Sequence, residues 1–285
     1  MAKFTNEDYK NPLELFNGNT LTELTYDYLV SNNYKQRESR SQDRRENIRF
    51  SPSQIGRTDR DVVLYMLGYI GTPVDGRVLT IMDNGTSFHN RIEGVFEDMG
   101  IMVAPELSLK DPDLKVSGRS DAIIWNYLRE EDEEDGEVIK LEDVDGKIVY
   151  EGPENYVLLV EFKSISENGF YKLPKTKPRQ DHEDQLQLYF YLTGITKGLI
   201  YYENKNNQAV TEFVVERDDE RIKEITNRIK RLVKRAEEGD IPEPEEPKTH
   251  YDIMFSNYKD MSFPNTNPVS MDSLFDIIDE ANKQD

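Results

Sequence analysis

Apolar positions along the chain follow two spacings, one typical of helices and one typical of strands. One apolar run, VLLV at 157–160, leads directly into Glu161, and Lys163 follows two places later. A run of this kind between polar loops predicts a strand that is buried on both faces. Because side chains alternate along a strand, Glu161 and Lys163 are expected on one face, about 6 to 7 Å apart along the chain. The end of a buried strand therefore carries two opposite charges.

Helical spacing predicts four helices. Residues 51–70 begin with Ser-Pro-Ser, a favourable helix start, and continue with apolar residues at helical steps. Further helices are expected over 81–99 and 182–192. Residues 220–239 give the clearest amphipathic helix, with apolar residues every three or four positions.

Strand patterns lie between these helices. Residues 102–110 and 116–127 are expected to form one strand each, and 198–215 a closing pair of strands. Residues 127–155 have the composition of an insertion, an acidic block followed by two strand-like pieces around Asp-Gly at 145–146, which predicts a hairpin. The order of helices and strands favours a single α/β core with extensions.

Three divisions of the chain follow from these patterns. The core is expected over 51–240 and includes the insertion. Residues 1–50 are expected to be an extension with one or two short helices and a mobile basic segment, and 241–285 a linker and tail.

The composition excludes several kinds of chemistry. The chain has no cysteine, which rules out disulfides, thiolate nucleophiles, cysteine-held zinc and iron–sulfur clusters. It has only three histidines, so a bound metal would have mainly oxygen ligands, which suit Mg²⁺ or Mn²⁺. Without an 18-residue apolar run or a signal-peptide pattern, we expect a soluble, cytoplasmic protein from a bacterial or phage-infected cell, with no membrane contact.

The net charge of −20 disfavours a protein that binds nucleic acid over its whole surface. Acidic residues concentrate in 129–138 and 237–247, which are solvated loops by default or surfaces for a protein partner. Basic residues gather in 34–50 and 170–180, where a polyanion could bind.

An aspartate and the Glu-x-Lys unit on neighbouring strands can meet at one end of a sheet. Asp121 precedes an apolar run and, taken alone, is explained as a turn residue. Glu161 and Lys163 could equally form a salt bridge at a sheet edge, but a charge that ends a buried strand needs a partner or a metal. Two carboxylates, a divalent ion that neutralises them and a lysine that orients a water suffice for phosphodiester hydrolysis.

The order of these motifs resembles the PD-(D/E)XK nuclease superfamily, in particular its RecB-like branch, over residues 51–262. In this order, a helical histidine and glutamate one turn apart precede the aspartate, and a glutamine and tyrosine one turn apart follow the Glu-x-Lys unit. The residues are His89, Glu93, Asp121, Glu161, Lys163, Gln185 and Tyr189. The resemblance implies a restriction-endonuclease-like core, a mixed central sheet flanked by helices, here with the acidic hairpin inserted.

The resemblance also implies roles. It makes Asp121, Glu161 and Lys163 catalytic, and His89, Asp121, Glu161 and the Phe162 carbonyl the metal ligands, with Glu93 as possible support for His89. It places Gln185 and Tyr189 beside the site to position DNA. We expect further DNA contacts from arginines of the first basic segment and from the loop after Lys163: Arg44, Arg45, Arg49, Arg57, Lys172, Lys175, Lys177 and Arg179. Individually, His89 is explained as a packed or surface histidine, Tyr189 as a core residue and Gln185 as a surface residue.

The chain departs from the branch in its cysteines. Many members hold an iron–sulfur cluster with four cysteines, whereas this chain has Ile55-Gly56-Arg57 near the first helix and a cysteine-free tail. We therefore expect packing around Tyr258 and Phe263 to take the place of the cluster.

The interpretation we favour is a metal-dependent DNA nuclease, an exonuclease that processes DNA ends or single strands in replication, recombination or repair. One alternative is a non-catalytic DNA-binding or assembly subunit with the same fold, which the acidic surface favours. A second alternative is an α/β protein in which the motif match is due to chance.

Overall fold

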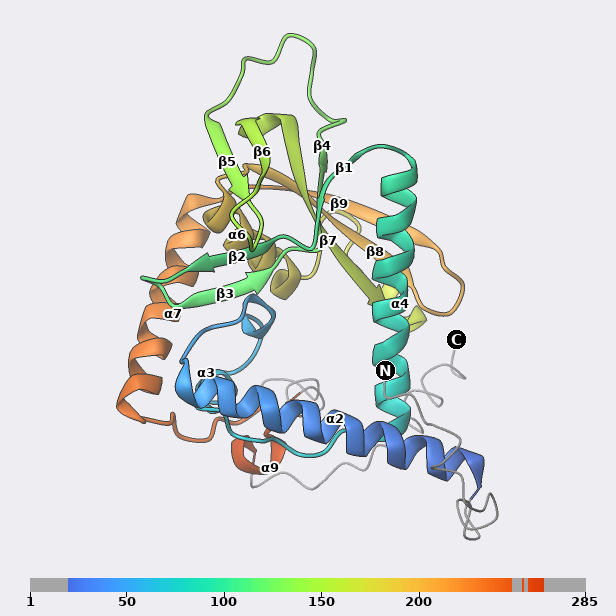
Figure 1. The fold of residues 1–285 in the computed structure, drawn as a ribbon, viewed down its shortest axis with the longest axis vertical. Coiled ribbons are helices and arrows are strands. Elements are labelled where there is room, and N and C mark those ends of the chain that lie inside the picture. The colour runs from blue at the N-terminus through green and yellow to red at the C-terminus, as the bar shows by residue number, and fades with distance from the viewer. Residues whose placement is uncertain (1–19, 248–252, 254–255, 264–285) are drawn as a thin grey trace.

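The computed structural model describes residues 20–247, 253 and 256–263. At its centre is a five-stranded sheet in the order β1-β4-β7-β8-β9 (Figure 1). Its strands are β1 (Met102–Pro105), β4 (Ala122–Trp125), β7 (Val157–Ile165), β8 (Lys197–Asn204) and β9 (Val210–Glu216). β7 runs parallel to β8, and the other neighbouring pairs are antiparallel. The predicted fold class, a mixed central sheet flanked by helices, is confirmed.

β7 is the central strand of this sheet and is covered on both faces, as its apolar run predicts. Val157 and Leu159 join a cluster with Leu186 and Phe190 of α6 (Gln180–Thr193). Leu158, Val160 and Phe162 join a second cluster with Phe88 and Ile92 of α4 (Gly76–Asp98). Each face of β7 thus has its own helix, and residues 157–162 are all buried.

Helix α7 (Asp219–Glu238) contacts α6 and α3 (Asp59–Met66). It is the helix predicted over 220–239, and its apolar stripe, which includes Ile225, Ile229 and Leu232, lies in a third buried cluster with Val62 and Val63 of α3. α7 ends at Gly239, which takes a left-handed conformation with φ +67°.

Two small hairpins accompany the main sheet, β2 (Ser108–Asp111) with β3 (Val116–Arg119), and β5 (Val138–Glu142) with β6 (Ile148–Pro153). The second confirms the hairpin that Asp-Gly predicts. The expectation of one continuous strand over 102–110 and one over 116–127 is wrong. Both break, at Glu106–Leu107 and Ser120–Asp121, because the chain leaves the main sheet there to form β2 and β3.

The N-terminal part is more helical than predicted. α2 (Leu21–Glu46) is one 26-residue helix that includes most of the basic segment expected to be mobile. A capping box between Thr20 and Glu23 starts it, and α3 and α4 contact its side. It lies at the end of the molecule opposite the β5–β6 hairpin (Figure 1).

The segment that begins with Ser-Pro-Ser does not start the predicted helix. Pro52–Gln54 form a single 3-10 turn, η1, and α3 begins only at Asp59, where Thr58 caps it. The chain needs this turn because Phe50, fully buried, bridges to Val116 of β3 and directs residues 51–58 across the sheet. α4 likewise begins earlier than expected, at Gly76 with Asp75 as its cap. The other short elements are η2 (Glu154–Tyr156), α5 (Glu167–Tyr171) and α9 (Lys259–Ser262). No helix in the described part of the chain is long and apolar enough to cross a bilayer.

The described residues of the tail attach to α3. Tyr258 and Phe263 are both buried, as expected, and the Tyr258 hydroxyl donates to the Tyr69 carbonyl at 3.1 Å. Ser262 is hydrogen-bonded to the buried Asp61 carboxylate, and Arg60 donates to the Met261 carbonyl at 2.9 Å. Polar contacts and two buried aromatic side chains therefore hold the tail to the first core helix and the residues just after it.

Tyr258→Ala tests the contribution of this attachment to stability. Truncating a buried aromatic side chain is expected to lower the free energy of unfolding by about 3 kcal/mol. Tyr28→Ala on α2 is the matched control, because Tyr28 is 52% exposed. This substitution should change the free energy of unfolding by less than about 0.5 kcal/mol. Urea denaturation of both variants is the measurement. Equal midpoints for the two would show that the tail does not stabilise the core.

Candidate active site

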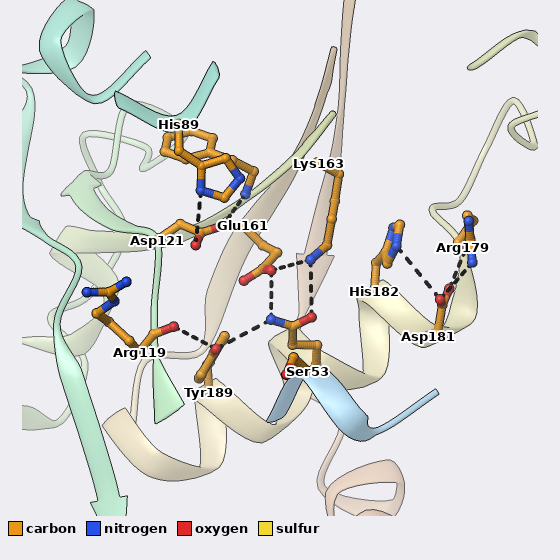
Figure 2. A network of polar contacts seen from close by, with 12 residues as sticks. Ser53, His89, Arg119, Asp121, Glu161, Lys163, Arg179, Asp181, His182 and Tyr189 are labelled. Atoms are coloured by element: carbon orange, nitrogen blue, oxygen red, sulfur yellow. Dashed lines mark hydrogen bonds and ion pairs between the residues drawn. The ribbon is translucent and has the colours of Figure 1, made fainter. Parts of the chain in front are cut away.

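Asp121 and Glu161 face each other across the β4–β7 pair. The register pairs Ala122 with Val160, which places Asp121, the residue before β4, opposite Glu161. The Phe162 N–H donates to Asp121 Oδ2 at 2.7 Å, and this bond extends the pairing beyond the last residue of β4. The two predicted carboxylates therefore meet where β4 begins (Figure 2).

Lys163 lies on the same face of β7 as Glu161, as strand alternation predicts. Its Nζ donates to Glu161 Oε1 at 2.5 Å. Glu161 is 2% exposed, whereas Lys163 is half-buried. The charge pair thus forms at the end of the buried strand, and the lysine is the more exposed of its two members.

Helix α6 completes this network from the other side. Gln185 Nε2 donates to Glu161 Oε1 at 2.7 Å, and Gln185 Oε1 accepts from Lys163 Nζ at 3.2 Å. Tyr189, one turn further, donates through its hydroxyl to the Arg119 carbonyl at 2.7 Å. Gln185 holds the charged pair in place. Tyr189 is buried, so its hydroxyl fixes the β3–β4 corner from inside the core.

His89 approaches from α4. Its Nδ1 lies 3.5 Å from Asp121 Oδ1, and its ring makes edge contacts with Phe88 and Phe162. Burial lowers the pKa of His89, and a hydrogen bond to the Phe162 backbone opposes this shift. Glu93 lies one turn along α4, and its Oε1 is buried without a hydrogen-bond partner. The structure therefore brings His89, Asp121, Glu161 and the Phe162 backbone together, and we find no support from Glu93 to His89 within the described residues.

Burial sets the charge state of the two carboxyl groups. Desolvation raises the pKa of Asp121 to about 6. Desolvation, and then the charge of Asp121, raise the pKa of Glu161 to about 7. Burial alone would lower the pKa of Lys163, but the Glu161 and Asp121 carboxylates outweigh it and raise that pKa. The site thus holds two acidic groups that resist carrying full charge together, beside one firmly charged lysine.

A divalent cation would relieve this repulsion, and Glu161 Oε2 is an oxygen atom that could bind it. Glu161 Oε2 is buried and has no hydrogen-bond partner within the described part of the chain. Carboxylate and carbonyl oxygens with one imidazole are donors that suit Mg²⁺ or Mn²⁺, so the residues fit the ion. The described residues contain no group of three His, Cys, Asp or Glu side chains already gathered at metal-binding distance. Binding would therefore require His89, Asp121 and Glu161 to move closer together around the ion.

The predicted DNA contacts lie in two places. Lys172, Lys175 and Lys177 are exposed on the loop that follows α5, and Arg179 caps the start of α6 and pairs with Asp181 at 2.7 Å. Arg57 lies between η1 and α3, partly buried, near the carboxylates of Asp61 and Asp181.

The arginines of the first basic segment have partners on α2 and α3. Arg44 stacks on the Tyr65 ring at 4.3 Å from its centroid. Arg45 donates to the Gly68 carbonyl at 3.2 Å, and Arg49 pairs with Asp43. These side chains therefore fasten α2 as well as adding positive charge.

A second polar network, which the sequence motifs do not single out, lies beside Lys163 (Figure 2). Tyr202 on β8 is 2.8 Å from His182 Nδ1, and its hydroxyl also accepts the Arg179 N–H at 3.2 Å. The other ring nitrogen of His182, Nε2, lies 3.7 Å from Asp181 Oδ2. Desolvation, and then Lys163, lower the pKa of His182 to about 3, so it stays neutral. His182 lies three residues before Gln185, a spacing that places both on one helix face and could have revealed it.

Comparisons with known proteins add little to this geometry. No family model and no curated protein matches the chain. The solved structure of SSO0001 is similar at 14% identity and a TM-score of 0.45, covering 85% of this chain and 97% of that one. An alkaline exonuclease, LHK-Exo from Laribacter hongkongensis, is similar at 14% identity and a TM-score of 0.41, covering 68% of this chain and 90% of that one. LHK-Exo in complex with dAMP is similar at 13% identity and a TM-score of 0.42, covering 69% of this chain and 92% of that one. Likenesses this weak support no conclusion about function.

Asp121→Asn tests the charge conflict in metal-free protein. The folded-state pKa of Asp121, about 6, lies above its ordinary 3.8, so stability is lost as pH rises through this interval and stays lost above it. Asparagine can still accept the Phe162 N–H and carries no charge. With EDTA at pH 8 we expect the free energy of unfolding of the variant to exceed that of the native protein by about 1 to 3 kcal/mol. At pH 5 we expect about half that difference.

Thermal unfolding of both proteins, with and without Mn²⁺, is the measurement. Mn²⁺ should raise the midpoint of the native protein and leave that of Asp121→Asn nearly unchanged. Asp145→Asn, at the exposed hairpin turn, is the matched control and should behave like the native chain. A loss of stability in Asp121→Asn at pH 8 would contradict the charge conflict.

Proposed function

We propose that this protein is an Mg²⁺- or Mn²⁺-dependent DNA nuclease, an exonuclease that processes DNA ends or single strands in replication, recombination or repair. The observation that carries the proposal is the convergence of Asp121, Glu161 and Lys163 at one end of β7, where Glu161 Oε2 is buried without a partner. An ion-pair network that served stability alone would be expected to satisfy that oxygen.

Each residue has a part that follows from its position. Asp121, Glu161, His89 and the Phe162 carbonyl would hold the cation, which stabilises negative charge on a phosphodiester. Lys163, whose ammonium Glu161 and Gln185 fix, would orient a water or a phosphate oxygen. Gln185 keeps the lysine and the carboxylate in one geometry, which a reaction with a fixed line of attack requires.

The distribution of charge supports a DNA strand as the substrate. The protein carries a net charge of −20, so a strand would be repelled by most of the surface. The exposed lysines of the loop before α6, with Arg179 at its end, are a local exception between Lys163 and Gln185 in the chain. Contacts of this kind bind phosphates irrespective of sequence, as an end-processing enzyme needs.

A non-catalytic DNA-binding or assembly subunit is the second candidate. Two observations favour it, the acidic composition and the lack, among the described residues, of a ready three-residue metal group. The presence of Asp121, Glu161 and Lys163 in one network disfavours it, because a subunit without activity has no use for a buried carboxylate pair that costs stability.

Turnover on end-labelled linear DNA, single- and double-stranded, with Mn²⁺, separates the two candidates. Lys163→Ala is expected to lower the rate by at least about 100-fold, the usual contribution of a positioned proton-transfer or charge-stabilising group. Lys140→Ala is the matched control, since Lys140 is exposed on the hairpin and pairs with Glu142 there. If the native protein and both variants are equally inert and bind no Mn²⁺, the catalytic proposal is wrong.

The salt dependence of binding tests the basic loop. With about four phosphate contacts to a single strand, raising salt from 50 to 200 mM should weaken binding by about 50-fold. Replacing Lys172, Lys175 and Lys177 together by alanine should lower the slope of log K against log salt by about 2. Fluorescence anisotropy of a labelled single strand, with Ca²⁺ in place of Mn²⁺, is the measurement. A flat response in the native protein would exclude this loop as the DNA contact.

A further inference from the structure

Arg228 of α7 uses all three of its guanidinium nitrogens to hold one short loop. Nη1 donates to the Ile55 carbonyl and Nη2 to the Arg57 carbonyl, both at 2.5 Å. Nε donates to Asp59 Oδ1 at 2.9 Å. Three contacts to residues 55–59, more than 160 positions away in the chain, make this arginine a clamp on the turn between η1 and α3.

The clamped loop lies against the first turn of α6. Ile55 is buried in the cluster that α3 and α7 share. Gly56 is so close to α6 that a Cβ there would come within 2.8 Å of Asp181 Cβ. Arg57 therefore follows a glycine that packs directly against Asp181. The charge of Arg57 interacts with those of Asp181 and Arg179.

This seat borders the candidate active site. Asp181 and His182 belong to the same turn of α6, one turn before Gln185, and both interact electrostatically with Lys163. η1, which carries Ser53, contacts α6 as well (Figure 2). Arg57 and Arg179 both interact with Asp181, whose charge also interacts with Lys163, and we call these two arginines the basic rim. The backbone position of Arg57 depends on the loop that Arg228 holds.

We propose that Arg228 is a positioning residue for the substrate strand: it fixes residues 55–59 so that Arg57 joins Arg179 in contacting the phosphate backbone next to Lys163. This inference rests on the proposed function. Arginine is required because a planar guanidinium reaches three acceptors at once, whereas the ammonium of lysine is a single point charge. Arg228 itself does not touch the strand.

Arg228→Lys tests this role, and α7 offers a matched control. Arg231 lies one turn on, donates to the other oxygen of Asp59 at 2.8 Å, and is 59% exposed. Arg231→Lys therefore keeps the charge and disturbs the same carboxylate without touching the Ile55 and Arg57 carbonyls. For Arg228→Lys we expect KM on single-stranded DNA to rise about 10-fold, with kcat within about twofold of native. For Arg231→Lys we expect both constants to stay within about twofold.

The salt slope of DNA binding provides a readout that loose packing would not move. Loss of one phosphate contact should lower the slope by about 0.7 for a single strand in Arg228→Lys, and leave it unchanged in Arg231→Lys. This arm uses Ca²⁺ and needs no turnover. It therefore still tests the inference if the native protein binds DNA but proves inactive, the outcome that would refute the proposed nuclease activity alone.

Gly56→Ala unseats the same loop from the opposite side and keeps the test open if Arg228→Lys folds poorly. Its added methyl group meets Asp181, so it should reproduce the higher KM and the smaller salt slope. The inference is overturned if Arg228→Lys matches Arg231→Lys in both readouts, if Gly56→Ala binds DNA like the native protein, or if the loss falls on kcat with KM unchanged.

Discussion

A carboxylate buried at the end of the central strand is the constraint on which the rest of the site depends. Glu161 is nearly inaccessible, lies opposite Asp121 and has one oxygen without a partner. Removing such a group from water costs several kcal/mol unless charge and hydrogen bonds compensate it. Lys163 and Gln185 supply that compensation on one oxygen only. The fold therefore holds a group that destabilises it, as the proposed active site would require.

Much of the secondary structure supports this group directly. The antiparallel β4–β7 register brings Asp121 to Glu161, while the parallel β7–β8 pair carries Tyr202 to the N-terminal turn of α6. α6 then carries His182, Gln185 and Tyr189 at three- and four-residue steps, and they contact β8, β7 and β3 respectively. Because three elements converge on one strand end, a shift of any of them by a single residue would separate the charges that stabilise one another.

The parts that could be predicted from the sequence are those governed by local periodicity. The apolar run of β7, the amphipathic stripe of α7 and the Asp-Gly hairpin signal each have one solution, and each is found. The missed features depend on distant partners. The strands at 102–110 and 116–127 break because β2 and β3 leave the main sheet, and residues 51–58 form a turn because Phe50 is anchored on Val116. Asp121, Glu161 and Lys163 could be proposed as a site from their order, and His182 could have been added from its helical spacing to Gln185, but no sequence pattern links Arg228 to the carbonyls that it holds.

The charge balance also gains a physical explanation from the structure. A net charge of −20 does not prevent local attraction, because fields from exposed charges are screened within about 10 Å at moderate salt. The basic side chains near Lys163 are kept at short range by contacts that fix their backbone, such as the Arg179 N–H on Tyr202 and the Arg57 carbonyl on Arg228. A strand that reaches this rim meets positive charge whose position is already determined, so less conformational entropy is lost on binding. The positions of these basic side chains, rather than the total charge, would thus decide whether this acidic protein binds a nucleic-acid strand.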